Sequence, residues 1–234
     1  GANVAIYSEV EDMVQQTIAK WGRIDILINN AGILRDKTFS KMSLDDFSLV
    51  MDVHLMGSVN CSKAVWDIMK EQQYGRIVMT TSSSGLYGNF GQSNYGAAKM
   101  AVIGLMNTLG IEGAKNNVRV NALAPTAATR MTEDLMPAEV LAMLVPEAVT
   151  AGALVLCHDD APSRNILCAG AGGYATSAIF ETEGVYLPPE QQTPEAVVAH
   201  WDKISDCSEQ SKMETGFNQS EKFLLKAQKY LQDK

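Results

Sequence analysis

The chain has 234 residues, of which 46% are hydrophobic and 20% are charged, and its formal net charge is −8. This length suffices for one large domain with its own core, and the acidic balance argues against nucleic acid and anionic membranes as partners, because both require a basic surface. No apolar run approaches the ~20 residues of a membrane span, no signal peptide is recognisable, and the four cysteines form no C-x-x-C pair, which argues against a transmembrane helix, a disulfide framework and a metal site.

The N-terminal part alternates short apolar runs with stretches of helical spacing. Residues 2–7 predict a buried strand, and apolar residues at helical spacing predict an amphipathic helix over about 9–21. Gly22 is expected to end this helix. Residues 24–28 predict a second strand, which ends in a turn of sequence N-N-A-G at 29–32.

The middle of the chain continues this alternation. Ser43 has the character of a helix N-cap, since acidic residues follow it in the first turn. A further apolar helix is expected over about 53–72, and residues 75–81 predict the third strand. Residues 82–91, rich in serine and glycine, predict a loop, and residues 93–115 predict a helix.

A fourth strand is expected over 118–124, and a helical stretch leads from there to a last short strand over 165–169. Nearly continuous apolar strands that alternate with helices predict a parallel sheet covered on both faces, which is a doubly wound, Rossmann-like α/β fold. We expect residues 1–180 to form the dinucleotide-binding and catalytic domain. Residues 181–234, where the composition becomes polar, are expected to form a C-terminal extension.

Tyr95 and Lys99 carry the chemical prediction. They lie four positions apart in a predicted helix, so their side chains share one face. A lysine ammonium beside a phenol lowers the phenol pKa from ~10 by roughly 1–3 units, which brings it closer to the range of a working acid and base. Ser82 lies at a strand end, where ligands bind in doubly wound sheets, and its hydroxyl can hold the substrate oxygen beside the phenol.

A Y-x-x-x-K pair alone is a weak signal, because it occurs by chance on many helices, where both side chains are simply solvated. Here it accompanies the strand-end serine, the N-N-A-G turn and the segment V-N-A-L-A-P at 120–125. The combination favours a hydride transfer between a nicotinamide cofactor and a secondary alcohol or ketone.

These motifs resemble the short-chain dehydrogenase/reductase family. The segment GRIVMTTSSSGLYGNFGQSNYGAAK, with NNAGILRDKTF and VHLMGS before it, is similar to the (3R)-hydroxyacyl-CoA dehydrogenase domains of peroxisomal multifunctional enzymes type 2 and to their bacterial relatives. The resemblance runs from residue 1 to the low 200s. It implies NAD as cofactor, an acyl-CoA or similar small molecule as substrate, oxidation of a (3R)-3-hydroxyacyl-CoA to the 3-ketoacyl-CoA in fatty acid β-oxidation, and a homodimer.

The resemblance also implies roles for individual residues. Tyr95 would be the proton donor and acceptor, Lys99 its partner and a contact of the nicotinamide ribose, and Ser82 the hydroxyl that orients the substrate. His54 stands where many family members have an asparagine that shapes a kink and holds a relay water; a packed helix histidine is an equally good interpretation. The expected cofactor contacts are Val10, Asn30, Ala31, Gly32, Tyr95, Lys99, Pro125, Ala127 and Thr129.

The sequence departs from the family pattern in one large respect, because it contains no glycine-rich T-G-x-x-x-G-x-G turn to bind the pyrophosphate. The glycine-rich residues 169–173 follow the last strand and predict an ordinary turn. We therefore expect the natural protein to be longer. The charge cluster at 35–37 could approach coenzyme A phosphates, although such clusters are more often solvated.

Two other functions remain open at this point. One is a steroid or other secondary-alcohol dehydrogenase of the same family, which would use the same catalytic groups. The other is a truncated, non-catalytic subunit or interaction module. The expected location is the cytoplasm, or the peroxisome if the chain belongs to a larger multifunctional enzyme.

Overall fold

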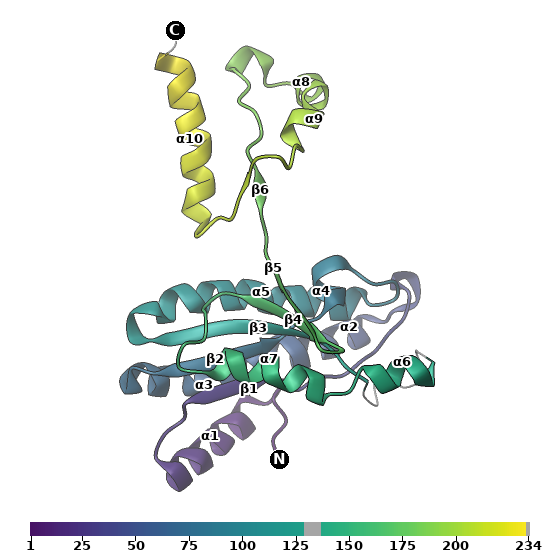
Figure 1. The fold of residues 1–234 in the computed structure, drawn as a ribbon, viewed down its shortest axis with the longest axis vertical. Coiled ribbons are helices and arrows are strands. Elements are labelled where there is room, and N and C mark those ends of the chain that lie inside the picture. Colours follow the sequence, from purple (N-terminus) through teal and green to yellow (C-terminus); the bar gives the residue numbers. More distant parts are fainter. Residues whose placement is uncertain (129–136, 233–234) are drawn as a thin grey trace. The chain divides into compact units, whose positions relative to one another are not determined.

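The computed structural model describes residues 1–128 and 137–232. They form two compact units, Gly1–Ser177 and Ala178–Lys234, which Figure 1 shows as ribbons. The first unit is an α/β structure and holds all the residues that the sequence predicts to be catalytic. The second unit is small and mainly helical.

The first unit is built on one five-stranded sheet with the strand order β1-β2-β3-β4-β5. The strands are β1 (Ile26–Asn29), β2 (Gly75–Thr80), β3 (Val118–Thr126), β4 (Ile166–Gly170) and β5 (Gly173–Ser177). The first four strands run parallel, and β5 is antiparallel to β4. The predicted class, an α/β fold with a mostly parallel sheet, is confirmed.

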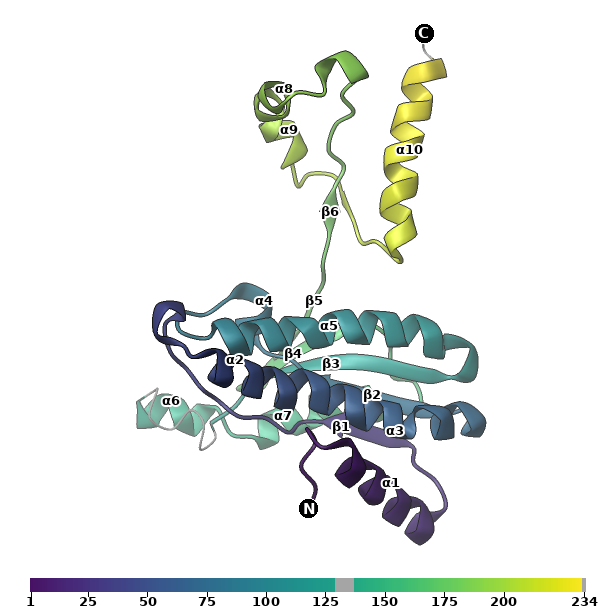
Figure 2. The same cartoon turned by 180° about the vertical axis from the view of Figure 1, so that it is seen from behind.

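Helices cover both faces of this sheet. The helices of the first unit are α1 (Tyr7–Trp21), α2 (Leu44–Met51), α3 (Gly57–Gln72), α4 (Ser83–Tyr87), α5 (Ser93–Gly113), α6 (Ala138–Met143) and α7 (Glu147–Cys157). Figures 1 and 2 show α3 and α5 on one face and α7 on the other. Successive residues of β2 therefore enter different layers: Ile77 packs with Met106 of α5, and Val78 packs with Leu156 of α7.

Residues 2–7 do not form the predicted strand. Asn3 Oδ1 accepts a hydrogen bond from the Ala5 N–H at 3.1 Å, and the Ile6 N–H donates to the Asn3 carbonyl at 2.9 Å, so this segment is a turn. Helix α1 already begins at Tyr7. An apolar run becomes a strand only beside a partner strand, and in the described part of the chain β1 pairs with β2 alone.

The capping signals are confirmed at two helix ends. Gly22 adopts φ 76° after α1, and its N–H donates to the Ile18 carbonyl at 2.7 Å. Ser43 precedes α2, and its hydroxyl accepts from the Asp46 N–H at 3.1 Å.

The helix predicted over 53–72 is interrupted near its start. Residues Asp52–Met56 form a π-helical turn, and α3 begins at Gly57. A Cβ atom at Gly57 would lie 2.6 Å from the Val4 side chain, so only glycine allows this approach. Single π-turns inside helices are frequent at functional sites, and this one contains His54.

Two further segments differ from the sequence-based expectation. Residues 82–91 are not all loop, because Ser82 caps the short helix α4 by accepting from the Ser84 N–H at 3.2 Å. Strand β5 was not predicted at all. The turn predicted in 169–173 is present, since Ala171 and Gly172 adopt φ 49° and 78° and reverse the chain from β4 into β5.

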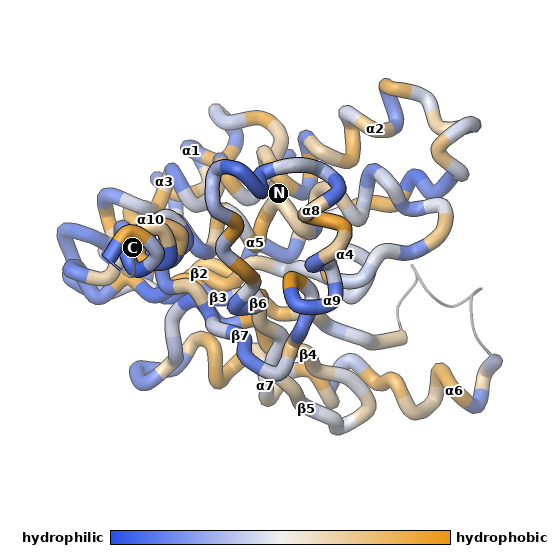
Figure 3. The backbone as a smooth tube through the Cα atoms, turned by 90° about the horizontal axis from the view of Figure 1, so that it is seen from above, coloured by the Kyte–Doolittle hydropathy of each residue, from blue (hydrophilic) through white to orange (hydrophobic). Residues whose placement is uncertain are grey.

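The expectation that no apolar run reaches the length of a membrane span is wrong, judged by length and composition alone. The 20 residues Ala138–Cys157 are long and apolar enough to qualify, and much of α6 carries apolar colours in Figure 3. In the structure these residues form two helices, and α7 packs Val149 and Leu156 against the sheet. Core packing therefore accounts for part of the apolar character of α7, whereas Leu154 and Val155 of the same helix are exposed.

The second unit is a small antiparallel strand pair with three helices. It contains β6 (Glu181–Thr182), α8 (Pro194–Ala199), α9 (Trp201–Ile204), β7 (Gln210–Ser211) and α10 (Gly216–Gln232). Lys222 and Lys226 of α10 form ion pairs with Glu181 and Glu183. Helix α10 is thereby attached to β6 and to the residue that follows it.

Candidate active site

The expected catalytic residues gather at the carboxyl end of β2. Ser82 follows this strand, and Tyr95 and Lys99 lie in the first turns of α5. Lys99 Nζ donates to the Thr80 carbonyl at 2.6 Å, and Thr81 Oγ1 donates to the Lys99 carbonyl at 2.7 Å. These two bonds fix α5 to the strand end and hold the buried lysine in place.

The Tyr95 side chain lies among the other expected catalytic residues. Its ring lies 5.5 Å from Lys99 Nζ, and the Ser82 hydroxyl is near enough to lower the pKa of its phenol. The His54 ring packs edge-on against it, with 5.1 Å between the ring centroids and an interplanar angle of 89°. The structure thus brings together all four residues that the sequence singled out for catalysis.

The predicted fall of the Tyr95 pKa is not found in this structure. Burial raises the pKa of Tyr95 above its ordinary value, and the hydrogen bond from Ser82 acts in the opposite direction. Burial also lowers the pKa of Lys99 to about 8. The sequence-based expectation was wrong in sign because it considered the lysine charge and not the cost of placing a phenolate in a buried site.

His54 is held by backbone groups of Ile33. Its Nε2 atom lies 2.8 Å from the Ile33 carbonyl oxygen and 3.1 Å from the Ile33 nitrogen. Its Nδ1 atom is buried, and no described residue offers it a hydrogen-bond partner. Burial and, to a smaller extent, the charge of Lys99 lower the pKa of His54 to about 4. A neutral, packed ring fits this environment better than a residue that exchanges protons at neutral pH.

The turn after β1 lies beside the same strand end. Asn30, Ala31 and Gly32 are exposed, and Asn30 Oδ1 accepts from Thr80 Oγ1 at 3.4 Å. Thr80 also supplies the carbonyl that holds Lys99, and among the described residues that carbonyl is the one acceptor found for the ammonium group. An exposed turn and a lysine with free donors are features that fit the ribose and nicotinamide end of a dinucleotide.

The other expected cofactor contacts are placed less uniformly. Pro125 lies near the end of β3, in register with Ala169 of β4, and Ala127 is partly buried against the α7 layer. Val10 is fully buried in α1 and has no surface to offer a ligand in this conformation. Thr129 lies outside the described residues.

The charge cluster at 35–37 is tied to its neighbours. Arg35 Nε and Lys37 Nζ lie 3.9 Å and 3.2 Å from the carboxylate of Asp46, and Asp36 accepts from Gln92 Nε2 at 2.7 Å. Two acidic side chains thus balance the two basic ones. The cluster links this loop to α2 and α5, and its charges are already compensated before any phosphate approaches.

Sequence reasoning missed Asn94, which precedes Tyr95. Asn94 is fully buried, its Nδ2 donates to the Arg35 carbonyl at 3.1 Å, and its Oδ1 accepts from the Tyr95 N–H at 2.7 Å. An asparagine in the first turn of a predicted helix was the available signal, because such residues satisfy the unpaired N–H groups at that end.

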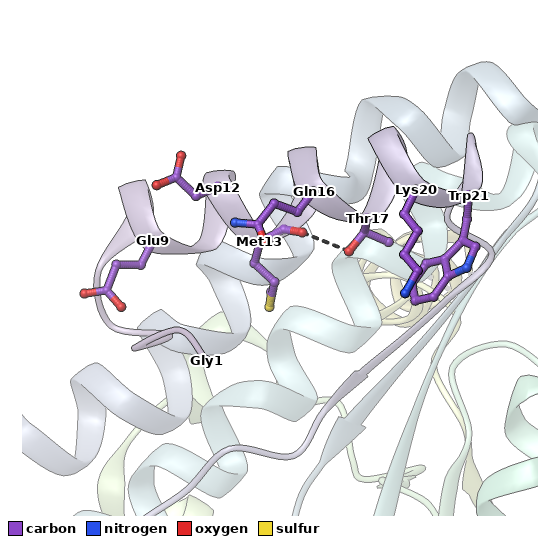
Figure 4. Close-up of a pocket in the computed structure, with 8 residues that line it drawn as sticks. All are labelled: Gly1, Glu9, Asp12, Met13, Gln16, Thr17, Lys20 and Trp21. Carbon is purple, nitrogen blue, oxygen red and sulfur yellow. Dashed lines mark hydrogen bonds between the residues drawn. The ribbon is translucent and has the colours of Figure 1, made fainter.

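The hollow drawn in Figure 4 is a different place. It has a volume of about 410 Å³ and lies along α1, where Glu9, Asp12 and Trp21 contribute to its lining. None of the expected site residues lines it. Nor do the described residues contain a group of three His, Cys, Asp or Glu side chains that could hold a metal ion.

Comparisons with known proteins agree with this arrangement. The family model described as short chain dehydrogenase matches residues 1–139. The chain is 46% identical over 221 residues to peroxisomal multifunctional enzyme type 2 of Mus musculus. This alignment covers 92% of this chain and 30% of the mouse protein. It is 40% identical over 190 residues to a 3-oxoacyl-[acyl-carrier-protein] reductase of Synechocystis, covering 78% of this chain and 73% of that protein.

Solved structures show the same likeness. The structure of full-length peroxisomal multifunctional enzyme type 2 from Drosophila melanogaster matches with a TM-score of 0.80 and 37% sequence identity. The match covers 95% of this chain and 40% of the Drosophila chain. The present chain therefore spans less than half the length of the multifunctional enzymes that it resembles.

Proposed function

The chain belongs to the short chain dehydrogenase family, and on that premise we propose that it oxidises the hydroxyl of a (3R)-3-hydroxyacyl-CoA to a ketone, with NAD as hydride acceptor. The observation that carries the reaction type is the placement of Tyr95 beside Ser82 and Lys99 at one strand end. The substrate class is supported by the likeness to multifunctional enzyme type 2 and to a protein named for its 3-oxoacyl substrate.

Each residue has a distinct task in this reaction. The Ser82 hydroxyl donates a hydrogen bond to the substrate oxygen and keeps it beside Tyr95. Tyr95, as phenolate, accepts the hydroxyl proton, and Lys99, whose Nζ lies 5.5 Å from the Tyr95 ring, stands beside it. NAD, when bound, would accept the hydride from the carbon that carries the hydroxyl. His54 keeps the phenol ring oriented through its edge-on contact.

The residues proposed to hold the cofactor are Asn30, Ala31, Gly32, Lys99, Pro125, Ala127 and Thr129. Tyr95 would contact its nicotinamide end, and Val10 would require a local rearrangement of α1 to take part, because it is fully buried. We further propose that the first unit performs catalysis and that the protein acts as a homodimer. Its location is proposed to be cytoplasmic, or peroxisomal if it is part of a multifunctional enzyme like the relatives named above.

The test is NADH formation from (3R)- and (3S)-3-hydroxyacyl-CoA and from a steroid secondary alcohol, assayed with the wild type and with Tyr95→Phe. We expect turnover of the R thioester and a loss of about 10²–10⁴-fold in Tyr95→Phe. Tyr87→Phe is the matched control, because Tyr87 is exposed and its hydroxyl contacts Ser177 instead of the site. Preference for the steroid would contradict the substrate class, and equal activity of Tyr95→Phe would contradict the mechanism.

A further inference from the structure

The side chain of Asn94 joins three parts of the chain around the start of α5. Its Nδ2 donates to the Arg35 carbonyl at 3.1 Å and, at 3.5 Å, to the carbonyl of Asp46 in α2. Its Oδ1 accepts from the Tyr95 N–H at 2.7 Å. The side chain is fully buried, so these bonds satisfy an amide that would otherwise be costly to enclose.

Neighbouring bonds strengthen the same connection. Gln92 Nε2 donates to Asp36 at 2.7 Å, and the Lys37 N–H donates to the Gly91 carbonyl at 2.9 Å. The loop at 35–37 is therefore attached to the residues that lead into α5 at several points. Ile33, which precedes this loop by two residues, contacts His54 through its backbone, and the His54 ring packs on Tyr95.

We propose that Asn94 is a positioning residue for Tyr95: it ties the first turn of α5 to the Arg35 and Asp46 carbonyls and so keeps the phenol beside Ser82. The inference rests on the proposed function in that it takes Tyr95 as the group that moves the proton. The expected effect is large, because a shift of ~1 Å in a reacting group can cost ~10²-fold in rate.

Asn121 provides a matched control for a purely structural role. It too is fully buried, its Nδ2 donates to the Pro162 carbonyl at 2.6 Å, and its Oδ1 accepts from the Asn165 N–H at 3.1 Å. It lies in β3, and its amide bonds are made to the segment before β4. Truncating either asparagine removes a comparable set of hydrogen bonds, so the two variants should lose similar stability.

The decisive readout is the titration of the Tyr95 phenol, which is monitored by ultraviolet absorbance. The signal of Tyr95 is the difference between each protein and the same protein carrying Tyr95→Phe. In the wild type, Ser82→Ala should raise the pKa of Tyr95, because it removes the bond that lowers it. In an Asn94→Ala background, we expect Ser82→Ala to have no further effect. In an Asn121→Ala background, the shift should persist.

Kinetics give a second readout. We expect Asn94→Ala to lower kcat by about 10–100-fold while KM changes by less than about 3-fold, and Asn121→Ala to leave both near wild type. Asn94→Asp serves if Asn94→Ala does not fold: it keeps the acceptor for the Tyr95 N–H but cannot donate to the two carbonyls. It should also lose the effect of Ser82→Ala.

The proposal is overturned if the shift caused by Ser82→Ala survives in full in either Asn94 variant. It is also overturned if Asn94→Ala and Asn121→Ala lose kcat equally. The proposed function can fail separately: a wild-type protein that shows the phenol titration but oxidises no hydroxyacyl-CoA would refute that substrate while the titration still decides the role of Asn94.

Discussion

A Cβ atom at Gly32 would lie 2.4 Å from Cε1 of His54, so the turn after β1 and the π-helical turn are in direct contact. The glycine of the N-N-A-G motif is therefore required by the close approach of His54. Since His54 in turn packs on Tyr95, the turn expected to contact the cofactor and the phenol expected to move the proton are joined through one imidazole ring.

Gly32→Ala tests this contact. The added methyl group must displace His54, so we expect a loss of about 1–3 kcal/mol in the free energy of unfolding, together with weaker NAD-dependent turnover. Urea denaturation measures the first effect. Gly104→Ala is the control, because nothing lies within 4 Å of that position in α5 and alanine favours a helix by roughly 0.5–1 kcal/mol. Equal stabilities of the two variants would show that the contact is not maintained in solution.

Lys99 should make the free energy of unfolding depend on pH in the alkaline range. Its folded-state pKa is lowered to about 8 from 10.5, so between these values the unfolded chain binds more protons than the folded one. The free energy of unfolding should therefore rise with pH across this window, by on the order of 3 kcal/mol, and Lys99→Met should remove the rise. Tyr95, whose pKa is raised, opposes this trend only above its ordinary value of ~10. Thermal unfolding at a series of pH values measures it, and an identical slope in Lys99→Met would contradict the assignment.

His54 should act at the acid end. Its folded-state pKa is lowered to about 4 from 6.5, so its contribution to stability is complete above 6.5 and declines as pH falls toward 4. His54→Asn should therefore be less sensitive to pH than the wild type in this window. The pH profile of kcat should show no group titrating near 6.5 that His54→Asn abolishes. Such a group would instead identify His54 as a proton-transfer residue.

Ser82→Ala tests whether the Ser82 hydroxyl orients the substrate for the reaction. Loss of the hydroxyl removes the proposed hydrogen bond to the reacting oxygen and, in the free protein, the group that lowers the Tyr95 pKa. We expect kcat to fall by about 10²-fold and the alkaline requirement of the reaction to move to higher pH. Ser83→Ala is the control, because Ser83 is an exposed residue of α4. An unchanged pH profile in Ser82→Ala would argue against the contact with Tyr95.

The sequence predicted most of the first unit where local patterns decide the structure. The apolar runs of β2 and β3, the N-cap at Ser43 and the helix end at Gly22 are all local features. Strand β5 escaped prediction because its residues 173–177 are mainly exposed and lack an apolar pattern. Residues 2–7 carry such a pattern but no partner strand, which no local signal reveals.

The candidate site was predictable as a set of residues and not as an electrostatic environment. The spacing of Tyr95 and Lys99 placed them on one helix face, and the structure brings Ser82 and His54 to them. The direction of the Tyr95 pKa shift depends on burial, which only the assembled fold defines. The role of Asn94 depends on carbonyls that lie far from it in the sequence.

Strand β1 leaves one edge of the sheet open among the described residues. It occupies one end of the strand order in the described chain, and its residues Ile26 and Ile28 are each 47% exposed. Among the described residues the backbone groups on this edge of β1 have no partner strand, so the edge can accept a further strand. Directly before the strand, Arg23 and Asp25 form an exposed ion pair with 2.5 Å between Nη2 and Oδ1. Charged residues in such a position act as gatekeepers against edge-to-edge pairing.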